Sequence, residues 1–156
     1  MEQKKTSPEW TRVAEVELVY KSKVKASERP VMKDSRDACH ILRQAWDENK
    51  IEMQEEFKVL FLNRNNRVLG VYETSAGGIS GTVADPRLIL AAAIKSLCVS
   101  IILCHNHPSG NLKPSRADEE LTTKIAEAAK YHDIKVLDHI IISSEGYYSF
   151  ADEGLL

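Results

Sequence analysis

Several stretches of the chain alternate between hydrophobic and polar positions, and this period of two predicts strands. Residues 12–21 (RVAEVELVYK) alternate after a polar tail at residues 1–11, which indicates a half-buried strand. Residues 55–62 (EEFKVLFL) are predicted to form a denser strand. The turn residues at 63–66 then predict that the following VLGVYET segment pairs back on this strand as a hairpin.

Other stretches have the apolar spacing of a helix, and each begins with residues that can cap a first turn. An Asp-Ser pair opens a helix predicted for residues 34–49, and an Asp-Pro pair opens another over residues 85–96. The glycine-rich residues 75–82 between these two helices are expected to be irregular. Ser115 is the best cap for a longer helix whose pattern fades near Tyr131.

Apolar runs in the second half of the chain predict the remaining strands. Residues 99–103 (VSIIL) are expected to form an interior strand, which a loop at residues 104–114 follows. One or two strands are predicted over residues 136–142, and a last short strand over residues 147–150. The resulting order, β-α-β-β-α-β-α-β-β, indicates a mixed α/β domain with helices packed against a central sheet.

Length and composition fit one compact domain. The chain has 156 residues, of which 43% are hydrophobic and 28% are charged, as in ordinary globular proteins. We expect residues 35–156 to form this domain, with residues 1–34 packed on it as an N-terminal strand and connection. Three cysteines without a C-x-x-C pair, together with a polar N-terminus, predict a cytoplasmic protein without disulfides.

The net charge of the chain bears on whether nucleic acid is a partner. The net charge of -2 and the isoelectric point of about 6.2 give no sign of a nucleic-acid footprint, although a local basic patch stays open. The longest apolar run is too short to span a bilayer, so we expect no membrane association.

Two histidines and an aspartate carry the most informative chemistry. His105 and His107 lie two apart directly after an apolar run, so an extended chain turns both rings to the same side. A loop with prolines and a glycine then leads to a helix whose first turn carries Asp118. Two imidazoles and one carboxylate suit zinc, and three protein ligands leave a fourth position for water. The pattern predicts a catalytic zinc centre, since bound zinc lowers the pKa of water to about 7.

Hydrolysis also needs a proton relay and a donor for developing negative charge. Glu55, at the start of a predicted strand, is the best candidate for the base because it shares the parity of an apolar face. Glu52 and Glu56 remain alternatives, and all three glutamates could be solvated charges. The Ser115 hydroxyl is placed to stabilise an oxyanion, although Ser115-x-x-Asp118 is also close to a helix capping box.

These residues resemble the JAMM/MPN+ metalloprotease motif, and their surroundings are similar to the RadC-like branch of that family. The similar segments are HNHPSGNLKPSRAD, VLDHIII, YYSFADEGLL and the EEFKVLFLN strand. The resemblance covers roughly residues 35 to 156. It implies a three-layer, cytidine-deaminase-like JAB/MPN domain of the α/β class.

The same resemblance implies roles for individual residues. His105, His107 and Asp118 would be zinc ligands, Glu55 the general base and Ser115 an oxyanion donor. Longer RadC-like chains carry an N-terminal helix-hairpin-helix region, and this sequence shows none. Asn106 stands where eukaryotic relatives usually have serine or threonine, which favours the bacterial branch.

The leading hypothesis is a zinc-dependent hydrolase of peptide or isopeptide bonds, with a peptide or protein as substrate. A DNA-repair accessory domain, suggested only by the family's name, and a non-catalytic zinc-binding module are the alternatives. Asp138 and His139 form either a dyad behind the metal ligands or, as the commoner arrangement, a buried hydrogen-bonded pair. Cys104 is expected to point away from His105 and into the core.

Overall fold

The computed structural model describes residues 16–17, 19–76 and 84–156. In chain order its helices and strands are α1 (Ser35–Gln44), β1 (Glu56–Leu62), β2 (Val68–Ala76), α2 (Pro86–Ser96), β3 (Ser100–Asn106), α3 (Arg116–Lys130), β4 (Lys135–Ile142) and β5 (Tyr147–Ser149). A 3-10 turn, Ala26–Glu28, precedes α1. No helix in these described ranges is long and apolar enough to cross a membrane.

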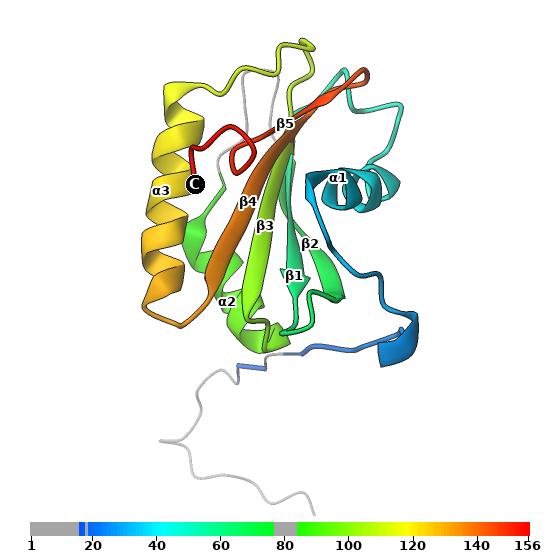
Figure 1. Ribbon diagram of the computed structural model, residues 1–156, viewed down its shortest axis with the longest axis vertical. Coiled ribbons are helices and arrows are strands. Elements are labelled where there is room, and N and C mark those ends of the chain that lie inside the picture. Colours follow the sequence, from blue (N-terminus) through cyan, green and yellow to red (C-terminus); the bar gives the residue numbers. More distant parts are fainter. Residues whose placement is uncertain (1–15, 18, 77–83) are drawn as a thin grey trace, which may run out of the picture.

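The strands form one mixed sheet in the order β2-β1-β3-β4-β5. β3 and β4 are parallel, whereas the other neighbouring pairs are antiparallel. In Figure 1, α1 lies on one face of this sheet, and α2 and α3 lie on the other. The predicted α/β fold with helices on both sides of a central sheet is therefore confirmed.

Each face of the sheet has its own apolar core. The core under α1 includes Leu42, Trp46, Leu60, Leu62, Ile102, Cys104, Ile140 and Ile142. The core under α2 and α3 includes Phe57, Val59, Phe61, Ile89, Ile101, Leu103, Ile125 and Ala129. Because successive strand residues point to opposite faces, both cores draw on β1 and β3. Cys104 accordingly faces α1, away from His105, as predicted.

The helix starts agree with the sequence, but α1 is shorter than expected. Asp34 caps α1 by accepting from the backbone N–H groups of its first turn, and Asp85 caps α2 in the same way. α1 ends at Gln44 rather than near Asn49. The Asp47 side chain accepts from the N–H of Asn49 at 2.9 Å, so a local turn replaces further helix there.

The predicted N-terminal strand is wrong over the part that the structure describes. Residues 16–17 and 19–21 are not in a strand, and the side chains of Val16 and Val19 are 84% and 63% exposed. An alternating pattern forms a strand only where a partner is available, and Arg67, directly before β2, instead bridges to Val31. The predicted tail at residues 1–11 lies outside the described residues.

The strand β3 is longer than expected and carries part of the predicted loop. It runs to Asn106 because strands on both sides continue to pair with it, Phe57 of β1 opposite His105 and Ile142 of β4 beside Asn106. β2 likewise extends into the glycine-rich segment as far as Ala76, and residues 77–83 lie outside the described residues. His105 is thus held in a hydrogen-bonded ladder rather than in a loop.

Candidate metal centre

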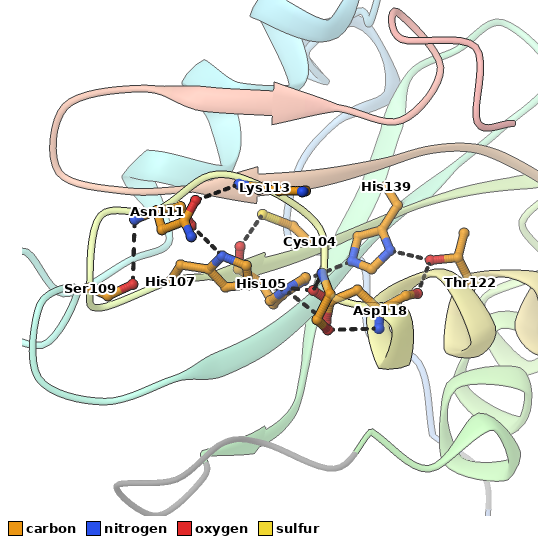
Figure 2. A network of polar contacts seen from close by, with 10 residues as sticks. Cys104, His105, His107, Ser109, Asn111, Lys113, Asp118, Thr122 and His139 are labelled. Atoms are coloured by element: carbon orange, nitrogen blue, oxygen red, sulfur yellow. Dashed lines mark hydrogen bonds and ion pairs between the residues drawn. The ribbon is translucent and has the colours of Figure 1, made fainter.

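The three predicted ligands come from the end of β3 and the start of α3 (Figure 2). His105 is buried within β3, and the backbone N–H of His107 continues the ladder by donating to Ile142 O at 2.9 Å. The loop then turns through Gly110, whose φ of +82° suits glycine. Asp118 lies in the first turn of α3 and faces both rings. The site is therefore at the carboxyl end of a parallel strand, a usual place for ligands in α/β sheets.

The distances among the three side chains suit a small divalent ion. Nε2 of His105 lies 2.9 Å from Nε2 of His107 and 3.2 Å from Oδ1 of Asp118. Nε2 of His107 lies 3.5 Å from Oδ2 of Asp118. Donor atoms on a tetrahedral ion with bonds of about 2.0–2.1 Å are about 3.3–3.4 Å apart. These residues thus fit the metal that the sequence predicts, and they form a candidate metal centre.

The hydrogen bonding of His107 leaves Nε2, the nitrogen that faces the other two proposed ligands, available to bind a metal. Its Nδ1 contacts the backbone carbonyl of Asn111 at 2.5 Å. A carbonyl oxygen can only accept, so Nδ1 carries the hydrogen and the neutral ring keeps a lone pair on Nε2. That nitrogen faces Nε2 of His105, and two lone pairs at 2.9 Å repel each other unless a proton or a metal ion lies between them.

Charge at the site follows from the same contacts. Burial opposes ionisation of Asp118, but its contacts with the imidazoles of His105 and His107 outweigh burial and hold the pKa of Asp118 well below its ordinary value. The hydrogen bond to Asp118 raises the pKa of His107, more than partial burial lowers it. Without metal, the centre therefore favours an ionised carboxylate beside a histidine that retains its proton more strongly than usual.

Zinc affinity is expected to fall as the pH falls, because zinc must displace the proton from His107. Because the pKa of His107 is raised, protons compete with zinc up to a pH above the ordinary histidine pKa of about 6.5. Below that raised pKa the affinity should drop by about tenfold per pH unit, and above it the affinity should level off. Zinc dissociation constants measured from about pH 5 to about pH 8 test this. A flat profile would show that no proton is displaced.

Asp118 also makes the capping box that the sequence offered as an alternative. Its Oδ2 accepts from the backbone N–H of Ser115 at 2.7 Å, and its own N–H donates to Ser115 Oγ at 3.1 Å. Oδ1 is directed to His105. Oδ1 therefore remains available to a metal ion beside His105, while Oδ2 serves the helix start and also lies near His107, so capping and metal binding are compatible.

The three candidate glutamates lie in different surroundings. Glu56 is 4% exposed and pairs with the buried Lys58, with Glu56 Oε2 3.2 Å from Lys58 Nζ, which leaves it unsuited to a base. Glu52 is exposed. Glu55 is half-buried just before β1, and its charge helps to raise the pKa of His107. Glu55 is therefore the glutamate that acts electrostatically on the metal centre, and its catalytic role stays a prediction.

Ser115 precedes the first turn of α3 and is exposed. Its Oγ accepts from Asp118 N–H, so its own hydrogen can be donated to another group. The serine can thus cap the helix and still serve as a donor, and the oxyanion role stays a prediction.

Asn106, between the two histidines, has a role that the sequence reasoning missed. Its side chain points to the α1 face, where Nδ2 donates to the carbonyls of Ile51 and Gln54 at 2.8 Å each. Its Oδ1 accepts from the N–H of Glu56 at 2.7 Å. One side chain of β3 therefore fixes the backbone on both sides of Glu55. A buried asparagine always needs partners, but nothing in the sequence says which segment supplies them.

Replacing Asn106 by alanine is expected to lower the free energy of unfolding by about 2–4 kcal/mol, since buried backbone groups lose their partners. Asn65→Ala, in the exposed turn between β1 and β2, serves as the matched control and should cost less than about 0.5 kcal/mol. Urea unfolding of both variants gives the comparison. Equal stability of the two variants would contradict the inference that the Asn106 side chain fixes the backbone on both sides of Glu55.

Asp138 and His139 do not form a side-chain pair. The Asp138 carboxylate accepts from the N–H of His139, the N–H of Ala151 and the hydroxyl of Ser149, so it fixes the end of the chain. Burial raises the pKa of Asp138. The His139 ring points the other way, and its Nε2 lies 2.8 Å from Nδ1 of His105. Of the two residues, His139 alone reaches the candidate metal centre.

Fold and site together define an α/β domain with a His-His-Asp centre at the carboxyl end of a central strand. The model of the RadC-like JAB domain matches residues 32–155 of the chain. The chain therefore belongs to the RadC-like JAB domain family, and the resemblance noted in the sequence is confirmed.

Curated relatives are named UPF0758 proteins. The chain is 50% identical over 101 residues to one from Flavobacterium johnsoniae, covering 65% of this chain and 44% of the relative. It is 38% identical over 130 residues to one from Rubrobacter xylanophilus, covering 82% and 55%. It is 41% identical over 103 residues to YfjY of Escherichia coli, covering 66% and 64%. The chain thus spans about half the length of most relatives it matches.

Proposed function

We propose that this domain is a zinc-dependent hydrolase that cleaves peptide or isopeptide bonds. The observation that carries the proposal is the convergence of two imidazole nitrogens and one ionised carboxylate within metal-binding distance of one another. Two nitrogens and one oxygen match the donor sets of catalytic zinc sites, which keep one coordination position open. Membership of the JAB domain family supports the same assignment.

Each residue of the centre has a defined task in this proposal. His105, His107 and Asp118 hold the metal. When bound, zinc would activate a water molecule and polarise the carbonyl of the scissile bond. Glu55 accepts a proton from the attacking water molecule while the oxygen of that water forms a bond to the carbonyl carbon. Glu55 then gives the proton to the leaving nitrogen as the C–N bond breaks.

Ser115 donates its hydroxyl hydrogen to the carbonyl oxygen while negative charge develops there. The helix start keeps the serine in place, because Oγ is fixed by the N–H of Asp118. The substrate in this proposal is a peptide or protein, because the site resembles the JAMM/MPN+ metalloprotease motif and its groups can attack an amide carbonyl.

The test combines metal content with turnover. Purified protein is loaded with zinc and incubated with a mixed peptide library and with lysine-linked isopeptides, and the products are read by mass spectrometry. We expect about one zinc per chain, and cleavage that a chelator stops and added zinc restores. Zinc at trace level only would overturn the proposal. Intact zinc with no cleavage in either library would favour a binding module instead.

A further inference from the structure

We propose that His139 and Thr122 are positioning residues of the metal centre, which fix the hydrogen of His105 on Nδ1 and so present Nε2 to the metal. This inference rests on the proposed zinc site and deepens it. Neither residue touches the site of the ion itself, and neither belongs to the spacing of the H-x-H motif. A chain of hydrogen-bonding contacts links them to two of the three ligands (Figure 2).

The direction of each hydrogen bond follows from one fixed point, the backbone carbonyl of Asp118. Thr122 Oγ lies 2.6 Å from this oxygen, which can only accept, so the threonine hydroxyl must donate its single hydrogen there. In its contact with Nδ1 of His139, the same hydroxyl therefore has to accept. It follows that Nδ1 of His139 carries a hydrogen.

The same logic continues to the ligand. His139 is fully buried and stacks on Phe150, with ring centroids 4.7 Å apart, and such burial keeps the imidazole neutral. A neutral ring with hydrogen on Nδ1 has a lone pair on Nε2, which therefore accepts from Nδ1 of His105 at 2.8 Å. The lone pair of His105 is then on Nε2, the atom that faces His107 and Asp118.

The network also joins the two elements that carry ligands. His105 is on β3, His139 on β4 and Thr122 on α3, one turn after Asp118. Thr122 thus connects the ring that orients His105 with the backbone of the residue that carries the third ligand. Metal-binding histidines usually donate their other N–H to a carboxylate, a carbonyl or water. Here a neutral imidazole is the acceptor, and a hydroxyl fixes that imidazole in turn.

The rings around His139 limit its movement. Phe57 packs edge-on at 5.6 Å between centroids and lies parallel to His105 at 5.9 Å. Phe57 and Phe150, the two phenyl rings packed on His139, are apolar and buried, so the N–H of His105 cannot exchange His139 for water without cost. Loss of the acceptor favours the other tautomer of His105, with hydrogen on the metal-binding nitrogen.

Two pairs of variants in the full chain test the inference. Thr122→Val removes the hydroxyl at nearly constant shape, and Thr122→Ser restores it. His139→Phe keeps an aromatic ring between its neighbours but has no acceptor, and His139→Gln restores an acceptor. Zinc dissociation constants come from competition with a chelator, and Co²⁺ absorption spectra report the geometry of the centre. The thermal unfolding of each metal-free variant serves as the fold control.

We expect Thr122→Val and His139→Phe to weaken zinc binding by about 10–100-fold and to alter the Co²⁺ spectrum. Thr122→Ser and His139→Gln should stay within about threefold of the wild-type affinity. A merely structural role would lower the unfolding temperature without metal and leave affinity and spectrum unchanged. If the wild-type protein binds zinc and Thr122→Val binds it equally well, this inference fails alone. If the wild-type protein binds no zinc, the proposed function fails as well.

Discussion

Zinc binding is expected to be lost when His107 is replaced by alanine. Structural zinc sites with four protein ligands bind with about 10–16 kcal/mol, so one ligand contributes about 3–4 kcal/mol, or about 10²–10³-fold in affinity. His107 supplies one of the three protein donors that the described residues bring to this centre, and its Nδ1 contact with Asn111 holds it in the binding tautomer. Loss of this donor leaves a two-ligand site that should not retain zinc through purification.

The matched control is His132→Ala, which removes an exposed histidine near the end of α3. Metal content by mass spectrometry of the native protein, and affinity by chelator competition, should distinguish the two variants. The control is expected to keep about one zinc per chain with an unchanged dissociation constant. Wild-type affinity in the His107→Ala protein would remove the ligand assignment and the hydrolase proposal with it.

The His-His-Asp centre was predictable because its members are local in sequence. His105 and His107 share one side of an extended segment, and the serine that caps α3 also brings Asp118 to face them. Strand parity and a helix start are short-range features, so the sequence carries them. The same is true of the caps at Asp34 and Asp85.

The groups behind the centre were not predictable in this way. Asn106 contacts a backbone segment about fifty residues earlier, and His139 meets His105 only because β4 pairs with β3 in one particular register. Sequence patterns give the face of a strand, but they do not give the register between strands. Thr122 looks like an ordinary helix residue until β4 is placed beside α3.

The errors in the fold have a common physical cause. Residues 12–21 alternate well, yet their described part forms no strand. A period of two shows that a segment can form a strand, but it does not show that a neighbouring strand is available for pairing. The end of α1 was placed too late for a related reason, since the turn at Asp47 competes with the helix. The periodicity was correct in both places, but pairing with a neighbouring strand is not formed in the described part of the first, and a local contact ended the helix in the second.

Turnover is expected to fall by about 10²–10⁴-fold in Glu55→Gln, while zinc affinity changes by no more than about threefold, since Glu55 acts on the centre only through its charge. The amide has nearly the shape of the carboxylate but cannot accept a proton from water, so the main loss is the proton relay. Glu55 is not one of the three proposed metal ligands, and Asn106 holds the backbone on either side of it in both proteins. The measurement is the rate of cleavage of the best peptide or isopeptide found in the library experiment.

Glu52→Gln is the control, because it removes a carboxylate from the same segment at an exposed position. Its turnover should match that of the wild type. Equal loss in both variants would mean that the general charge of the segment matters, and not a base at residue 55. Full activity in Glu55→Gln, with zinc bound, would instead require the proton to leave by another route, because no proton acceptor would remain at that position. The two variants therefore separate the relay from the metal, which His107→Ala cannot do, since it removes both the metal and every step that depends on it.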